Sequence, residues 1–403
     1  MALQAKLSIS QKHAGISALI PSQRHLFEIP DEIAYLNCAY MAPQMKAVSQ
    51  AGIEGLKRKA SPWRISAQDF FSEASEARRL FAELIGAGAT DVAIVPSASY
   101  GIAVAAANLP AAKGDRILVL EDQFPSNVYA WLNLRRTSGA EVVTVARPPD
   151  QDWTTALLRK VDEKTAVVAI PHVHWTDGTR VDLEAVAAAC RGVDAALVLD
   201  ATQSVGALPF SVQAVQPDFL IAAAYKWLLG PYGLAFMYVS ERFQDSQPIE
   251  HNWITRKNSE DFSGLVSYTD EFQRGAVRFD VGQRSNFALL PMAIAALKQV
   301  HRWTVADIAG TLTALTTELA RGAEELGLQV APEGCRSPHL IGLGFPGRMP
   351  DTLLQELADN HIYVSIRGTS MRVSPHVYNT LKDVRRLLEV LGNIVRTPAA
   401  RAL

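Results

Sequence analysis

The sequence contains too few cysteines for a disulfide framework. Its three cysteines, Cys38, Cys190 and Cys335, are widely spaced and odd in number. Metal sites built on cysteine need close spacings such as C-x-x-C, and these cysteines have none. We therefore expect no metal ligands here, and the unpaired thiols predict a reducing, cytoplasmic environment.

Long apolar runs and an excess of positive charge are also missing. Residues 1–22 are mixed polar and lack the apolar centre of a signal peptide. No run of about 18 apolar residues occurs, so we expect no membrane partner. The formal net charge is −2 and there is no long Lys/Arg block, which argues against a nucleic-acid partner.

What the chain does contain is a regular alternation of short apolar strands and helical segments. This alternation predicts an α/β fold with a mostly parallel, seven-stranded sheet flanked by helices. The last two strands are joined by a short turn, so an antiparallel strand is expected there. The expected strands are 92–95, 116–120, 141–145, 166–170, 196–200, 219–222 and 234–239.

A chain of 403 residues suits about two domains. The first part, residues 1–45, is interpreted as an N-terminal arm that is loose up to about Ile29. Residues 46–285 contain the alternating pattern and are expected to form the large α/β domain. Residues 286–403 change to helices with a few strands, which predicts a smaller C-terminal α+β domain.

Two charged residues stand at the ends of successive apolar strands. Asp200 closes the strand 196–200, and Lys226 follows the strand 219–222 within an apolar run. In an open α/β sheet, ligands bind at the carboxyl ends of the strands. The two charges are therefore either both solvated or both directed at one site, and a Lys with apolar neighbours is suited to imine chemistry.

The stretch from Asp200 to Gly206 has the form D-x-x-Q-x-x-G, and Lys226 follows it. This arrangement resembles the class V aminotransferase family, which are fold type I enzymes that use pyridoxal 5′-phosphate (PLP) and are related to cysteine desulfurases and kynureninases. The resemblance covers roughly residues 30–395. It implies that residues 46–285 form a PLP-binding domain.

The resemblance also implies a set of cofactor ligands. Lys226 would hold PLP as a Schiff base and move the Cα proton, and Asp200 would keep the pyridinium nitrogen protonated. Gln203 would bond to the ring oxygen, and Phe124 would stack on the ring as in kynureninases. Phosphate ligands would come from Ala98 and Ser99 at a helix N-terminus, from Tyr225, and from Ser285 and Asn286 of a partner subunit.

Substrate contacts are implied at three further positions. Arg372, before the run S-P-H-V-Y-N, would grip the α-carboxylate, because a guanidinium matches a carboxylate bidentately. Trp175 stands where desulfurases have Asn, and His174 precedes it. A lone His is more often structural, and His172 and His174 alternate across a strand end, so at most one of them faces the cofactor easily. Shared phosphate ligands imply a homodimer with shared active sites.

The resemblance is specific for cofactor and fold but leaves the reaction open. Desulfurases need a mobile Cys shortly before the substrate Arg, and the stretch from Tyr363 to Met371 has none. We expect a class V aminotransferase-like enzyme that acts on a small amino acid through a quinonoid intermediate. The alternatives are a lyase (kynureninase-like C–C or C–S cleavage) or an epimerase, and last a non-catalytic PLP-binding protein.

Overall fold

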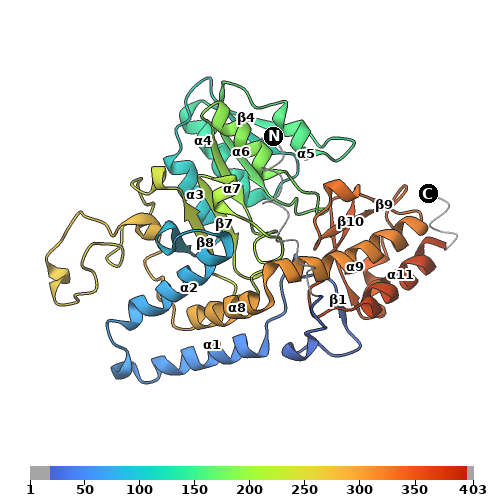
Figure 1. Ribbon diagram of the computed structural model, residues 1–403, viewed down its shortest axis with the longest axis horizontal. Coiled ribbons are helices and arrows are strands. Elements are labelled where there is room, and N and C mark those ends of the chain that lie inside the picture. Colours follow the sequence, from blue (N-terminus) through green and yellow to red (C-terminus); the bar gives the residue numbers. More distant parts are fainter. Residues whose placement is uncertain (1–18, 397–403) are drawn as a thin grey trace, which may run out of the picture.

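The computed structural model describes residues 19–396, and its centre is a seven-stranded sheet (Figure 1). The strand order is β2-β8-β7-β6-β5-β3-β4, and β8 alone runs antiparallel to its neighbours. The expected α/β sheet with one antiparallel strand is thereby confirmed. Its strands are β2 (Val92–Val95), β3 (Arg116–Leu120), β4 (Glu141–Val145), β5 (Thr165–Pro171), β6 (Ala196–Asp200), β7 (Phe219–Ala223) and β8 (Ala235–Val239).

Helices cover both faces of this sheet, which explains why its central strands are continuous apolar runs. One face packs against α3 (Ala98–Asn108) and α4 (Tyr129–Ser138). The other face packs against α2 (Asp69–Ile85), α5 (Trp153–Leu158), α6 (Leu183–Gly192), α7 (Val212–Val215) and α8 (Leu289–Trp303).

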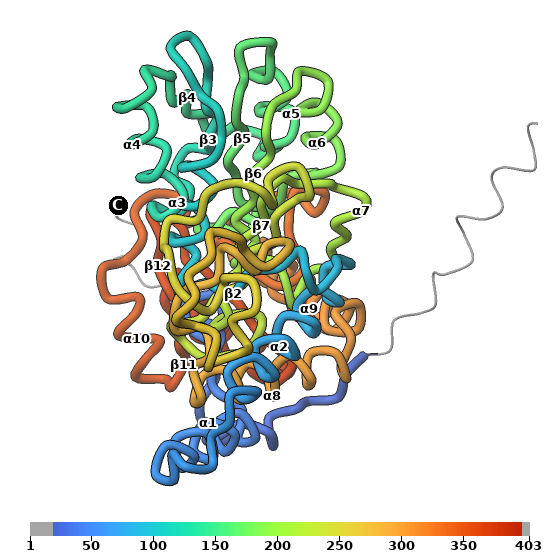
Figure 2. Tube along the Cα trace, turned by 90° about the vertical axis from the view of Figure 1, so that its left-hand side faces the viewer, coloured from blue at the N-terminus to red at the C-terminus, as the bar shows by residue number. Residues whose placement is uncertain are grey.

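The helix α1 (Lys46–Lys59) packs along α8 at the end of the molecule away from α4 and α6 (Figures 1 and 2). Two glycines of α1 permit this close approach. A Cβ at Gly52 would lie 2.7 Å from the sulfur of Met292, and one at Gly55 would lie 2.0 Å from the backbone oxygen of Phe287. No helix within residues 19–396 is both long enough and apolar enough to cross a bilayer.

A second core lies between the C-terminal elements and the N-terminal segment. The strand β1 (Ala34–Tyr35) pairs in parallel with β11 (Ile362–Tyr363), and Phe27 and Leu36 are buried. Within the stretch expected to be a loose arm up to Ile29, the backbone N–H of Gln23 donates to the backbone oxygen of Val377 at 2.8 Å and Phe27 is buried. Residues 1–18 lie outside the described residues. The other elements are α9 (Val305–Glu325), β9 (Gln329–Val330), β10 (Ile341–Gly344), α10 (Leu353–Asp359), β12 (Ser365–Arg367), β13 (Ser370–Val373) and α11 (Leu381–Arg396).

The apolar run over residues 362–366 forms two strands in the structure. Its first part is β11, which pairs with β1, whereas its second part is β12, which pairs with β13 in an antiparallel sheet of order β12-β13-β10-β9. A single apolar run does not reveal which partner each half will choose, because strand pairing is set by segments distant in the sequence. Strands as short as β11 and β12 therefore cannot be predicted from the local sequence pattern.

Candidate active site

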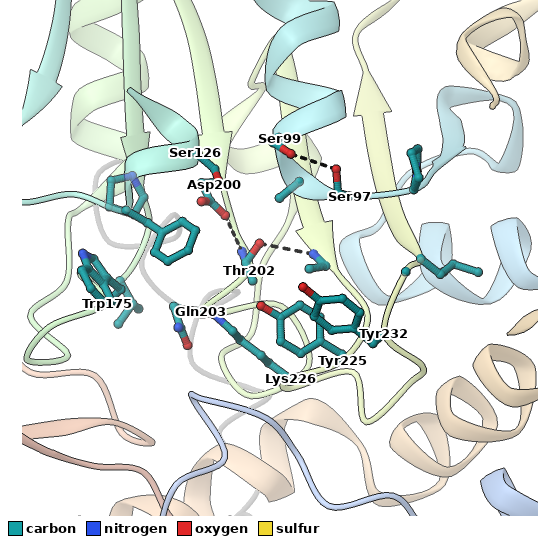
Figure 3. A pocket seen from close by; sticks show the side chains of 18 residues that line it. Ser97, Ser99, Ser126, Trp175, Asp200, Thr202, Gln203, Tyr225, Lys226 and Tyr232 are labelled. Carbon is teal, nitrogen blue, oxygen red and sulfur yellow. Dashed lines mark hydrogen bonds between the residues drawn. The ribbon is translucent and has the colours of Figure 1, made fainter. Parts of the chain in front are cut away.

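A cavity of about 220 Å³ lies at the carboxyl ends of the central strands, where the sequence places Asp200 and Lys226 (Figure 3). We call it the Lys226 cavity. Segments that follow β2, β3, β5, β6 and β7 all contribute to its wall. The lining residues are Pro96, Ser97, Ala98, Ser99, Phe124, Ser126, Pro171, Val173, Trp175, Asp200, Thr202, Gln203, Ala223, Tyr225, Lys226, Tyr232, Gly233 and Leu234.

Lys226 stands just beyond the end of β7 and is only 6% exposed. Its Nζ lies 5.5 Å from the ring centroids of both Phe124 and Tyr225. Burial lowers the pKa of this amine from 10.5 to about 8, because the charged form is poorly solvated, and the carboxylate of Asp200 opposes the shift. The neutral, nucleophilic fraction of this amine near pH 7 is therefore much larger than that of an ordinary lysine.

The loop after β6 holds the carboxylate of Asp200 at the cavity wall. Asp200 Oδ1 accepts from the backbone N–H of Thr202 at 3.0 Å, and Thr202 Oγ1 accepts from the backbone N–H of Ala223 at 3.2 Å (Figure 3). These bonds tie the end of β6 to the end of β7. Gly206 has φ +100°, and a Cβ there would lie 2.4 Å from the backbone oxygen of Trp227. The glycine of D-x-x-Q-x-x-G is thus required by its positive φ and by close backbone packing.

Gln203 also lines the cavity, and the fold fixes its amide. Gln203 Nε2 donates to the backbone oxygen of Ala39 at 3.1 Å, and its Oε1 accepts from Trp227 Nε1 at 2.9 Å. The amide nitrogen has a second hydrogen available. The N-terminal segment around Ala39 therefore helps to orient a residue of the cavity.

The N-terminus of α3 opens into the cavity. Ser97 caps the helix by accepting from the backbone N–H of Tyr100 at 3.2 Å, and Ser97 and Ser99 hydroxyls lie 2.9 Å apart (Figure 3). A Cβ at Gly101 would lie 2.7 Å from the Ile221 side chain, so this glycine lets α3 approach the sheet closely. Free N–H groups and the helix dipole make such a terminus suitable for an anion.

Aromatic rings form much of the remaining wall. The Phe124 ring meets the Trp175 ring edge-on, with centroids 5.3 Å apart and an interplanar angle of 85°. The Tyr225 and Tyr232 rings lie 4.7 Å apart between centroids (Figure 3). A flat apolar ligand would find stacking partners here.

Arg372 in β13 is buried beside the cavity, with 1% exposure. Its Nη1 donates to the backbone oxygen of Trp175 at 2.8 Å, whereas Nε and Nη2 are buried and have no hydrogen-bond partner among residues 19–396. Burial is the main reason that its pKa falls to about 9, followed by the nearby charge of Arg367. Buried unpaired guanidinium groups are costly, which indicates that an anion completes this site.

His174 is turned away from the cavity, contrary to its expected contact with substrate. The side chains that line the wall from this segment are Pro171, Val173 and Trp175, so alternation directs His172 and His174 to the other side. His174 Nδ1 lies 2.7 Å from Thr176 Oγ1, and Nε2 donates to the backbone oxygen of Glu121 at 3.0 Å. Burial lowers its pKa. Trp175, by contrast, lines the cavity.

Ser285 and Asn286 do not reach the Lys226 cavity of their own chain. Ser285 Oγ donates to the backbone oxygen of Phe70, and Asn286 Oδ1 accepts from the backbone N–H groups of Ala288 and Leu289. Both residues line a separate cavity beside Trp253. A phosphate contact by these residues would therefore have to be made across a subunit interface.

Several wall residues were not anticipated from the sequence, among them Ser97, Ser126, Thr202 and Tyr232. Thr202 lies inside the D-x-x-Q motif, and Ser97 directly precedes Ala98 and Ser99, the expected phosphate ligands. Their positions next to these motif residues could have predicted that both line the cavity. Tyr232 comes from the turn between β7 and β8, and nothing local distinguishes it. Only the folding of that turn over Tyr225 brings it to the cavity.

Comparison with known proteins places the chain in a family. The family model described as "Aminotransferase class-V" matches residues 42–387. An uncharacterized aminotransferase, YcbU, from Bacillus subtilis is 27% identical over 359 residues, which are 88% of this chain and 91% of that protein. A kynureninase from Deinococcus radiodurans is 28% identical over 278 residues, 64% of each chain.

Solved structures share the fold at low sequence identity. The apo cysteine desulfurase from Thermococcus onnurineus NA1 superposes with a TM-score of 0.81 at 20% identity, covering 94% of this chain and 99% of that one. A C-DES variant with glycine covalently linked to its PLP cofactor gives 0.83 at 18% identity, covering 92% and 99%. The likeness therefore extends over both the central sheet and the C-terminal elements.

Proposed function

The chain belongs to the class-V aminotransferase family of PLP-dependent enzymes, and we propose that it is an aminotransferase that acts on a small amino acid. One observation carries the proposal. The amine of Lys226 and the carboxylate of Asp200 share a buried cavity, and the partly unpaired guanidinium of Arg372 lies beside it. This set supplies an imine-forming amine, a partner for a pyridinium nitrogen and a carboxylate receptor.

The residues present fit PLP. The buried carboxylate of Asp200 suits the ring nitrogen, and the N-terminus of α3 at Ala98 and Ser99, with Tyr225 close by, suits the phosphate. Phe124 would lie against the ring, and Gln203 would donate to the ring oxygen. PLP, when bound, supplies the electron sink that makes the Cα–H bond of an amino acid labile.

The protein groups have separate tasks in such a reaction. The Lys226 amine holds the cofactor and, once released, accepts the proton from the substrate Cα and returns one. The Arg372 guanidinium orients the substrate by its carboxylate. The side chains of Phe124, Tyr225 and Trp175 form an aromatic wall of the cavity, against which a bound ring would stack.

We also propose that the protein is a homodimer whose Ser285 and Asn286 reach the cofactor phosphate of the partner. Both residues lie away from the Lys226 cavity of their own chain, in a cavity next to α1 and α8. Replacing Ser285 and Asn286 together with Ala should then weaken PLP binding in the dimer. An unchanged PLP affinity in a verified dimer would exclude this role.

A lyase reaction is the second candidate, and Phe124 favours it. A phenylalanine against the cofactor offers no proton, as in the kynureninase pattern, and a kynureninase is among the relatives. A desulfurase reaction fits less well. The β12–β13 hairpin has no Cys, and Cys38, though near Lys226, is fully buried with a pKa raised by that burial, so it is held as a neutral thiol.

A spectral screen of the purified, PLP-loaded enzyme with amino acids tests the proposal. An aminotransferase converts the cofactor to its amine form and releases a keto acid. A lyase leaves the cofactor spectrum restored and releases a fragment of the side chain. Asp200→Asn should lower turnover by at least roughly 100-fold while the cavity keeps its shape. A protein that takes up no PLP would refute the proposal as a whole.

A further inference from the structure

Arg367 and Arg372 lie on the same face of the β12–β13 hairpin. Arg367 pairs with Ser370 and Ser365 pairs with Arg372. Directly opposed residues share one face of a sheet, and so do alternate residues along one strand. The two arginines are therefore diagonal neighbours on one face, within reach of each other for long side chains.

Both arginines contact Trp175, which lines the Lys226 cavity. Arg372 bonds to its backbone oxygen, and the guanidinium carbon of Arg367 lies 5.7 Å from the Trp175 ring centroid. Arg367 also lies 5.9 Å from the ring centroid of Tyr40. Trp175 and Arg367 together line a second cavity of about 690 Å³ that adjoins the first at Trp175. Trp175 thus lines both the cavity that contains the Lys226 amine and the cavity that contains Arg367.

Arg367 has no acidic partner among residues 19–396. Its hydrogen bond goes to the backbone oxygen of its neighbour Ile366, at 2.7 Å. Arg147, which lines the same second cavity, is instead paired with Asp177. The charge of Arg367 contributes to the lowered pKa values of Lys226 and Arg372, in both cases after burial. Lys226, Arg367 and Arg372 therefore gather around Trp175, with Asp200 near Lys226 and with Asp122 also on the wall of the second cavity. An anion bound at Arg367 would relieve the repulsion among the three cations.

We propose that the substrate is an amino acid with an acidic side chain, and that Arg367 binds its distal carboxylate while Arg372 holds the α-carboxylate. This inference rests on the proposed function, because it places the substrate at the Lys226 cavity. A neutral amino acid bound in the Lys226 cavity would bring no anionic group to Arg367. A dicarboxylic amino acid brings one anionic group to each arginine, with Trp175 between them.

Isosteric substrate pairs test this proposal on the PLP-loaded, full-length enzyme. L-Aspartate is compared with L-asparagine, and L-glutamate with L-glutamine, by kcat/KM from the cofactor absorbance. A charge-assisted hydrogen bond corresponds to roughly 10- to 100-fold, so at least one acid should exceed its amide by that factor. Arg367→Met should remove the preference by lowering kcat/KM for the acid alone, and Arg367→Lys should keep part of it.

Arg348→Met is the matched control, because Arg348 is exposed, pairs with Asp351 and lines neither of the two cavities. Arg348→Met should leave the preference for the acid over its amide unchanged. An enzyme that uses the amides as well as the acids would overturn the inference, as would an equal loss for both in Arg367→Met, and neither result would touch the proposed function. A wild type that binds PLP but responds to no amino acid would overturn both.

Discussion

Arg372 is anchored to Trp175 through one nitrogen, and its other two nitrogens are buried without a partner in the part of the chain that the structure describes. The bond from Nη1 to the Trp175 backbone oxygen measures 2.8 Å, and it fixes the guanidinium plane beside the Lys226 cavity. The Arg372 guanidinium is fixed through Nη1, and its Nε and Nη2 are already oriented to donate to a carboxylate. Little side-chain entropy is therefore lost when a ligand binds.

Replacing Arg372 should therefore impair substrate binding far more than cofactor binding. Arg372→Met is expected to raise the apparent KM for an amino-acid substrate by roughly 10- to 100-fold, because charge-assisted bonds are lost. Arg372→Lys should recover little, since an ammonium cannot form the bidentate fork. Steady-state kinetics with a parallel PLP titration measures both effects. Equal losses of substrate and PLP affinity would remove Arg372 from the substrate role.

The lowered pKa of Lys226 predicts a specific pH dependence of PLP attachment. The neutral amine is the reactive form, so the attachment rate of the apoenzyme should rise with pH with a midpoint near pH 8 and level off at higher pH. An unperturbed lysine would keep gaining reactivity up to about pH 10.5. Stopped-flow absorbance with excess PLP measures the profile. Lys226→Ala should show no linkage to PLP that borohydride can reduce, and persistence of that linkage would place it on another residue.

His174 should prove to be structural. Its ring stacks on Trp153 with centroids 5.3 Å apart and lies within bonding distance of Thr176 and Glu121. His174→Ala should lower the free energy of unfolding by about 2–4 kcal/mol and leave KM nearly unchanged. Because burial lowers its folded-state pKa, the unfolded chain binds more protons below pH 6.5, so this group reduces stability as the pH falls. Urea unfolding of the wild type and the variant at pH 8 and 5.5 tests the two statements on stability, and steady-state kinetics tests the KM.

A buried ionic cluster should carry much of the stability near β2. Asp280 pairs with Arg78 and Arg284 and accepts from the backbone N–H of Ile94 at 2.7 Å. Asp280→Ala would leave two buried guanidinium groups unpaired, which is expected to cost about 3–5 kcal/mol. Asp245→Ala is the control, because Asp245 is exposed although it pairs with Arg278. Equal unfolding midpoints for the two variants would contradict this expectation.

The alternation of strands and helices was enough to predict the sheet, because buried parallel strands are short apolar runs bounded by polar turns. The D-x-x-Q-x-x-G motif and Lys226 likewise predicted one site, and the structure brings Asp200, Gln203 and Lys226 to one cavity together with Ala98, Ser99, Phe124 and Tyr225. Strand ends at the same edge of a sheet are neighbours whatever the connecting segments do. The family membership that these residues suggested is confirmed.

The direction of individual side chains and the approach of distant segments could not be obtained in this way. Local pattern did not decide between His174 and Trp175, because the register of the strand end after β5 sets which one faces the cavity. It also gave no sign that β1 pairs with β11.

The sequence by itself determined the sheet, the lysine and its acidic partner, because these depend on periodicity and on residues at strand ends. Tertiary structure alone placed Arg367 beside Trp175 and left Arg372 half-paired, because those contacts join strands more than 190 residues from the tryptophan. The groups proposed to hold the cofactor can thus be identified from the sequence. The groups proposed to select the substrate come together only when the C-terminal hairpin packs against the central sheet.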